Sequence, residues 1–122
     1  MSTVLLVDDD AVVRKILSAV LEQAGFSVLT AADGRSAIDA AKAHRGPLEV
    51  LVSDIQMPDL SGLEVAAALA ESRPGLKVLL LSSAEAPADL CEGWSFLQKP
   101  FPPAALIDKL AQIRVIGTGR AT

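Results

Sequence analysis

The chain is poor in cysteine and histidine, which are represented only by Cys91 and His44. A single cysteine excludes a disulfide within the chain and fits a reducing compartment. The lack of a cysteine and histidine cluster also argues against a zinc site, because zinc takes most of its protein ligands from these side chains. Carboxylates, hydroxyls and amines remain as the groups that could carry chemistry.

Long apolar runs are missing as well. Charged residues interrupt every window of the roughly 20 residues that a membrane-spanning helix needs. The acidic residues Asp8–Asp10 follow the first apolar run too early for that run to be the core of a signal peptide. We therefore expect a cytoplasmic protein.

An excess of positive charge is also lacking, since 11 basic residues face 15 acidic ones and the formal net charge is −4. Direct binding to nucleic acid requires a concentrated basic patch and is disfavoured by this balance. Neither glycine-rich phosphate-binding motif, G-x-x-x-x-G-K-[ST] or G-x-G-x-x-G, occurs in the chain. Nucleotide binding is therefore disfavoured too.

What the sequence does contain is enough apolar material for one domain, with 122 residues of which 51% are hydrophobic. Short apolar runs alternate with amphipathic stretches. The expected strands cover residues 3–7, 26–31, 48–53, 76–81 and 94–98, and the expected helices cover about 11–24, 35–44, 62–72, 84–93 and 102–113. The stretch 84–93 is the weakest, with room for about two turns opening near Pro87. This alternation predicts an α/β fold, a doubly wound five-stranded parallel sheet with helices on both faces.

Polar residues follow four of the expected strands. Asp8 and Asp9 follow the first strand, Asp54 the third, Ser82 the fourth and Lys99 the fifth. The carboxyl ends of parallel strands meet at one edge, where open α/β sheets bind ligands. Taken singly, each residue has an ordinary structural role as a turn residue, helix cap or surface charge. Their joint placement favours a functional site.

The expected site is strongly acidic. Two carboxylates about 4 Å apart repel by roughly 1 to 4 kcal/mol, and a hard divalent cation, above all Mg²⁺, would offset the repulsion. A carboxylate beside Mg²⁺ can act as a nucleophile and form an acyl phosphate. Mg²⁺ could then bind one phosphoryl oxygen, Lys99 a second and the Ser82 hydroxyl a third. We interpret Asp54 as the reactive centre.

The strand-end residues belong to four motifs. These are Val4-Leu5-Leu6-Val7-Asp8-Asp9-Asp10, Asp54-x-x-Met57-Pro58-x-x-Ser61-Gly62, Ser82-Ser83 and Lys99-Pro100-Phe101. In this order and at these spacings the chain resembles the receiver domain of two-component response regulators, similar to the chemotaxis response regulator. The resemblance covers about Val4 to Arg114 and implies a flavodoxin-like sheet with strand order 2-1-3-4-5. We accordingly expect a receiver domain over residues 1–114 and a tail or linker stub over 115–122.

The resemblance also implies roles for the acidic residues. Asp54 would be the phosphoacceptor, Asp9 a direct Mg²⁺ ligand and Asp8 a ligand through water. The backbone carbonyl of Gln56 would complete the metal ligands that the protein supplies. Gln56 and Ala84 fall at the variable positions that tune the lifetime of the acyl phosphate in the family.

On the other strands, the resemblance makes Ser82 the switch hydroxyl and Phe96 the switch aromatic residue. Lys99 would be the phosphate-binding lysine, joined to Pro100 by a cis peptide bond. The chain departs from the family between Ser82 and Phe96, where it is several residues shorter than a typical receiver. The fourth helix, at 84–93, is therefore expected to be shortened or irregular.

The expected function is a switch controlled by phosphorylation. A histidine kinase or histidine phosphotransfer protein would phosphorylate Asp54, and the change would reach a downstream protein or a second copy through the fourth helix, fifth strand and last helix. The chain would catalyse only its own phosphorylation and dephosphorylation, and would not be an enzyme acting on another substrate. One alternative is an interaction or dimerisation module that does not depend on phosphorylation. A phosphatase is disfavoured, because Gln56 stands where a second acid would be wanted.

Overall fold

The computed structural model describes residues 2–88 and 90–119, with side chains described as far as Ile113. Its centre is a sheet of five parallel strands in the order β2-β1-β3-β4-β5. The strands are β1 (Thr3–Val7), β2 (Ser27–Ala31), β3 (Val50–Asp54), β4 (Lys77–Ser82) and β5 (Ser95–Gln98). The predicted parallel sheet is confirmed, including its strand order.

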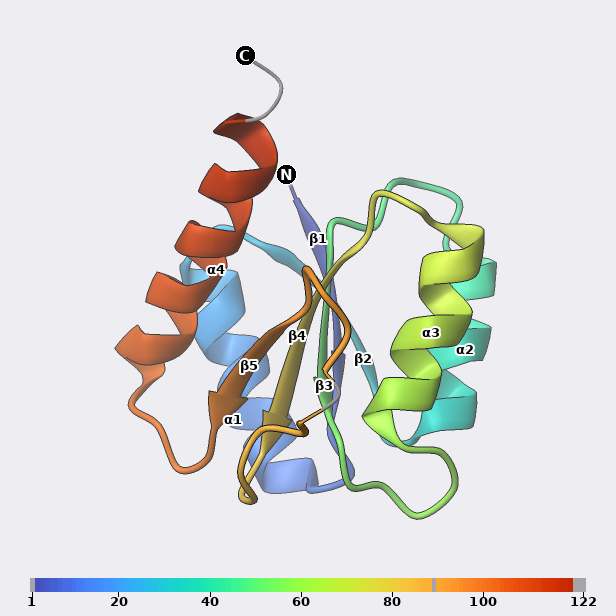
Figure 1. Cartoon of the computed structure of the whole chain (residues 1–122), viewed down its shortest axis with the longest axis horizontal. Helices are drawn as coiled ribbons and strands as arrows, with labels where there is room; N and C mark the ends of the chain where they lie inside the picture. The colour runs from blue at the N-terminus through green and yellow to red at the C-terminus, as the bar shows by residue number, and fades with distance from the viewer. Residues whose placement is uncertain (1, 89, 120–122) are drawn as a thin grey trace.

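In the described part of the chain, four helices cover this sheet in two layers. They are α1 (Ala11–Gln23), α2 (Gly34–Ala43), α3 (Gly62–Ser72) and α4 (Pro103–Gly119). Figure 1 shows α1 and α4 on one face and α2 and α3 on the other. The two-sided covering explains why the central strands are apolar along their whole length.

Side chains cap the N-termini of α1 and α3. Asp10 accepts hydrogen bonds from the amides of Val12 and Val13 at 2.9 and 3.1 Å and so starts α1. Ser61 and Glu64 form a capping box at the start of α3, in which each side chain accepts from the other residue's amide. Both caps fix the loops that follow β1 and β3.

Each face of the sheet buries one apolar layer, because successive strand residues point to opposite faces. The layer beneath α2 and α3 includes Leu5, Leu51, Val78 and Leu80. The layer beneath α1 and α4 includes Val4, Val52, Leu79, Leu81, Leu17 and Leu106. All residues of β3 are buried, so its last residue, Asp54, is held by a firmly packed strand.

The connection from β4 to β5 contains no helix in its described residues, 83–88 and 90–94. Of the two forms expected for 84–93, the structure shows the irregular one, and four described helices stand where five were expected. Pro87 has no backbone donor and Gly93 has a left-handed φ of 88°, so both disfavour a continuous helix. Leu90 and Trp94 are half-buried and pack against the layer beneath α2 and α3. We call residues 83–88 and 90–94 the strap, which crosses this face of the sheet (Figure 1).

The last helix, α4, continues to Gly119. It therefore passes Arg114, where the sequence analysis ends the domain, and the division of the chain at that residue stays a prediction. Among the described residues, no helix is both long and apolar enough to span a bilayer.

Candidate functional site

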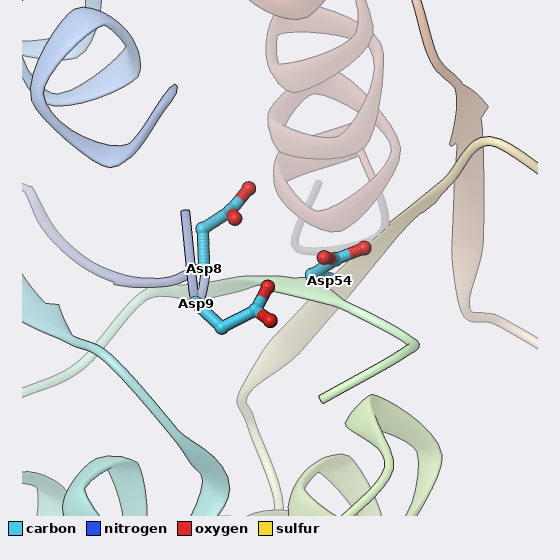
Figure 2. Close-up of side chains that lie close together, drawn as sticks. All are labelled: Asp8, Asp9 and Asp54. Carbon is cyan, nitrogen blue, oxygen red and sulfur yellow. The ribbon is translucent and has the colours of Figure 1, made fainter. Parts of the chain in front are cut away.

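Three acidic side chains converge at the carboxyl edge of the sheet (Figure 2). Asp8 and Asp9 follow β1, and Asp54 ends the neighbouring strand β3. The two strands pair with Val7 opposite Ser53, which brings the next residue of each strand to the same level. A carboxylate oxygen from each acid lies within 4.8 Å of those of the other two. The predicted acidic site is thus assembled by strand register.

Lys99 brings a positive charge to these acids from the end of β5. Its Nζ atom lies 2.9 Å from Oδ2 of Asp8 and 3.5 Å from Oδ2 of Asp54. The peptide bond between Lys99 and Pro100 is cis, as the sequence analysis predicts. The Lys99 amide also donates to the Ser82 carbonyl at 2.8 Å, which joins the ends of β4 and β5. All strand-end residues expected at the site therefore lie on one edge.

The electrostatics of this edge are set by burial and by an excess of negative charge. Asp8 is fully buried and Asp54 is 8% exposed, whereas Asp9 is exposed. Burial raises the pKa of Asp54, and the charges of Asp8 and Asp9 raise it further, while Lys99 acts in the opposite direction. Burial lowers the pKa of Lys99, but its hydrogen bonds and charge interactions with Asp8 and Asp54 outweigh this and raise it overall. One ammonium therefore does not neutralise the site.

The backbone of the acidic loop is held from α1, which the sequence analysis did not predict. The Arg14 guanidinium donates to the Asp8 carbonyl oxygen at 2.7 Å. The Asp10 amide donates to Oδ1 of Asp8 at 2.9 Å. Together with the Lys99 contact, these bonds leave Asp8 little freedom of orientation. The sequence hints at this contact only by placing a basic residue, Arg14, early in the helix that follows Asp8–Asp10.

Ser82, which is fully buried at the end of β4, makes a contact that the sequence analysis also missed. Its hydroxyl donates to the side-chain oxygen of Gln56 at 2.7 Å and accepts from the Ala84 amide at 3.0 Å. The sequence analysis predicts a role for the backbone carbonyl of Gln56, which stays a prediction. Phe96, the predicted switch aromatic residue, lies within β5 opposite Leu80 and packs half-buried on the apolar layer beneath α2 and α3.

The loop after Asp54 is packed tightly against that residue. The Gly62 amide donates to the Ile55 carbonyl at 2.9 Å. A Cβ atom on Gly62 would lie 2.3 Å from the Asp54 carbonyl oxygen, so only glycine fits there without a backbone shift. The glycine of the Ser61-Gly62 motif therefore fixes the distance between β3 and α3.

Asp59 connects the same loop to α2. Its carboxylate accepts from the amides of Gly34 and Arg35 at 3.0 and 2.8 Å. These hydrogen bonds lower the pKa of Asp59 to about 2. The position at a helix N-terminus also favours a negative charge. The sequence analysis did not predict this link, because the partners are far apart along the chain.

The donor set fits a hard divalent cation. Carboxylate oxygens are the ligands that Mg²⁺ prefers, and it is usually held by one or two carboxylates and further oxygens. The three acids offer such oxygens close together, and the uncompensated negative charge among them gives a cation a reason to bind. A soft metal would find no thiolate here, since the one cysteine, Cys91, lies exposed in the strap.

Comparisons with known proteins agree with this fold. The family model for the response regulator receiver domain matches residues 4–111. The chain belongs to this family and is a receiver domain of the two-component type. Receiver domains are signalling domains that accept a phosphoryl group.

Two curated relatives illustrate the match. The chain is 41% identical over 104 residues to the probable transcriptional regulatory protein TcrX of Mycobacterium tuberculosis, covering 81% of this chain and 44% of that protein. It is 36% identical over 118 residues to the response regulator MprA of Mycolicibacterium vanbaalenii, covering 93% of this chain and 49% of that protein. The chain thus spans under half the length of these relatives. Since TcrX is named as a transcriptional regulator, the expectation that the present chain avoids nucleic acid stays a prediction.

Solved structures resemble the whole fold. The chemotaxis protein CheY4 of Vibrio cholerae is similar with a TM-score of 0.84 and 32% identity, covering 93% of this chain and 98% of the other. The response regulator TrrA of Thermotoga maritima, solved in complex with Mg²⁺ and BeF, is similar with a TM-score of 0.81 and 28% identity, covering 93% and 99% of the two chains.

Proposed function

We propose that Asp54 is the phosphoacceptor of a switch that a histidine kinase or histidine phosphotransfer protein loads. The observation that carries the proposal is the position of Asp54 at the end of a buried strand, with Lys99 at 3.5 Å and two further acids beside it. This arrangement supplies a nucleophile, a cation for the phosphoryl group and a metal site in one place. It requires no separate general base, since a carboxylate is already a nucleophile.

We assign the metal site to Asp9 and Asp54 as direct ligands, to the Gln56 backbone carbonyl and, through water, to Asp8. Mg²⁺ bound there would neutralise charge on the phosphoryl oxygens. The family membership and the oxygen-rich donor set support this assignment.

The transfer itself is an in-line displacement. A carboxylate oxygen of Asp54 attacks the phosphorus, and the bond from phosphorus to the imidazole nitrogen of the donor breaks. The electron pair stays on that nitrogen. Lys99 then pairs with a phosphoryl oxygen in place of the carboxylate charge, and the Ser82 hydroxyl donates to another.

The output is a change of the surface made by the strap, β5 and α4. Ser82 and Phe96, at the end and in the middle of adjacent strands, would move together and bias that surface between two states. The recipient is a downstream protein or a second copy of the chain. In this proposal the chain acts only on its own Asp54, through loading and loss of the phosphoryl group.

The direct test is labelling with radioactive acetyl phosphate and Mg²⁺. We expect label on the wild-type protein, none on Asp54→Asn and undiminished label on Asp39→Asn, which makes the same change at an exposed site on α2. Label that persists in Asp54→Asn would reject the phosphoacceptor assignment. Label on Asp54 with no change in binding to partner proteins or in self-association would favour the phosphorylation-independent interaction module. A chelator should abolish labelling if the metal is required.

A further inference from the structure

A chain of two hydrogen bonds runs from the loop after Asp54 to the start of the strap. The Ala84 amide donates to the Ser82 hydroxyl oxygen at 3.0 Å, and the hydroxyl donates to the Gln56 side-chain oxygen at 2.7 Å. Ser82 is fully buried, whereas Gln56 is an exposed residue. Of the residues in this pair of hydrogen bonds, Gln56 is therefore the one whose side chain can be replaced without disturbing the core.

A hydroxyl has a single hydrogen to donate. While Ser82 donates to Gln56, the same hydrogen cannot be donated to a phosphoryl oxygen on Asp54. The two acceptors therefore compete for one donor. A neutral hydrogen bond of this kind contributes about 1 kcal/mol, which corresponds to roughly a fivefold change in an equilibrium constant.

We propose that the Gln56 side chain is a positioning residue that captures the Ser82 hydroxyl and thereby opposes loading of Asp54. This inference rests on the proposed function and adds a side-chain role to a residue whose backbone carbonyl is assigned to the metal. Release of the hydroxyl by Gln56 is then a step that a phosphoryl group must drive. The step carries a cost that depends on the residue at position 56.

The same capture controls the start of the strap. The hydroxyl orientation that suits Gln56 also leaves its oxygen free to accept from the Ala84 amide. Reorientation of the Ser82 side chain toward Asp54 disturbs this acceptor. The strap has a second tie nearby, because the Gln98 amide group donates to the Ser83 carbonyl at 3.3 Å. Loss of the Gln56 contact should therefore loosen the Ala84 amide without freeing the whole strap.

The test uses Gln56→Met, which keeps the side-chain length and removes the amide. Binding of beryllofluoride, a phosphoryl analogue, is measured in Mg²⁺ by ¹⁹F NMR. We expect Gln56→Met to bind about fivefold more tightly than the wild type. The same change at an exposed position of α1, Gln23→Met, should leave the affinity unchanged.

A double-mutant cycle separates capture of the hydroxyl from any other effect of position 56. In a Ser82→Ala background, Gln56→Met should no longer change beryllofluoride affinity. An undiminished effect in that background, or unchanged affinity in the single variant, overturns the proposal. If the wild-type protein bound no beryllofluoride in Mg²⁺, the proposed function itself would fail, and the inference with it.

A second readout needs no bound analogue. Amide hydrogen exchange at Ala84, followed by NMR in the protein alone, should be faster in Gln56→Met by about the same fivefold factor. Gln98→Met removes the other tie of the strap and should leave beryllofluoride affinity near that of the wild type. Unchanged Ala84 exchange in Gln56→Met would contradict the proposed hydrogen-bond chain.

Discussion

The ammonium of Lys99 lies 2.9 Å from Asp8, closer than its 3.5 Å distance to Asp54. Asp8 is fully buried, so this lysine is the ion-pair partner of a buried carboxylate. In the proposed function, Lys99 therefore contributes to both stability and chemistry. The two roles can be separated, because a bound metal ion can compensate the charge of Asp8 but cannot replace the contact of Lys99 with a phosphoryl oxygen.

Lys99→Met should lower the free energy of unfolding by about 2 kcal/mol, since it leaves a buried carboxylate without its cation. Saturating Mg²⁺ should recover part of this loss, but phosphoryl incorporation should stay at least about tenfold slower. Chemical denaturation with and without Mg²⁺ measures the first effect, and radioactive labelling the second. The control is Lys42→Met, at an exposed site on α2, which should change neither. Full recovery of labelling in Mg²⁺ would contradict the phosphate-binding role.

Asp54→Asn should stabilise the protein in metal-free buffer at neutral pH, by about 1 kcal/mol, because it removes a charge that burial and two neighbouring acids disfavour. The pKa of Asp54 is raised above its ordinary value of 3.8. The stabilisation from protonating this carboxylate is fully present below 3.8 and is lost as the pH rises through the raised pKa. The gain from asparagine should therefore vanish at low pH. Denaturation curves at neutral pH and near pH 3 test this, and a gain that persists at low pH would contradict it.

Asp59→Ala should destabilise α2 and lower Tm, since it removes the acceptor for the amides of Gly34 and Arg35. The pKa of Asp59 is lowered from 3.8 to about 2. Its stabilising contribution is complete above 3.8 and is lost as the pH falls toward about 2. The Tm difference between the wild type and Asp59→Ala should thus shrink in acid, as thermal unfolding at several pH values can measure. An equal difference at all pH values would assign the effect to packing.

Gly62→Ala should cost about 2 kcal/mol of stability and slow labelling, because its Cβ would overlap the Asp54 carbonyl oxygen. The backbone shift needed to relieve this contact moves Asp54, the proposed phosphoacceptor. Gly75→Ala is the matched control, since a Cβ there meets no atom within 4 Å. Equal stability of the two variants would show that the loop after β3 can shift its backbone without loss of stability.

The architecture of this chain is predictable because its signals are local and repeated. Apolar runs of strand length, amphipathic stretches of helix length and side-chain caps such as Asp10 and Ser61 fix the elements one by one. The position of Asp8 and Asp54 at strand ends then predicts that they lie close together, without knowledge of any tertiary contact. The strand ends predicted the site because parallel topology makes them neighbours.

The remaining features depend on contacts that no local pattern encodes. The bonds of Gln56 to Ser82 and of Asp59 to α2 join residues that are distant in sequence and depend on side-chain rotamers. The strap is short and contains Pro87 and Gly93, so helical periodicity could not decide its path. Its course is set by Leu90 and Trp94 packing on the sheet, which is a tertiary effect.

The strap also links two parts of the chain that pair within one sheet. Four strands and three helices precede it, and β5 with α4 follows it. Lys99 belongs to the smaller piece, whereas the three acids belong to the larger one. A single cut in the strap would thus leave a pocket made of two fragments, joined by β4 pairing with β5 and by the ion pair of Lys99 with Asp8. The site would then be complete only while the two fragments are associated.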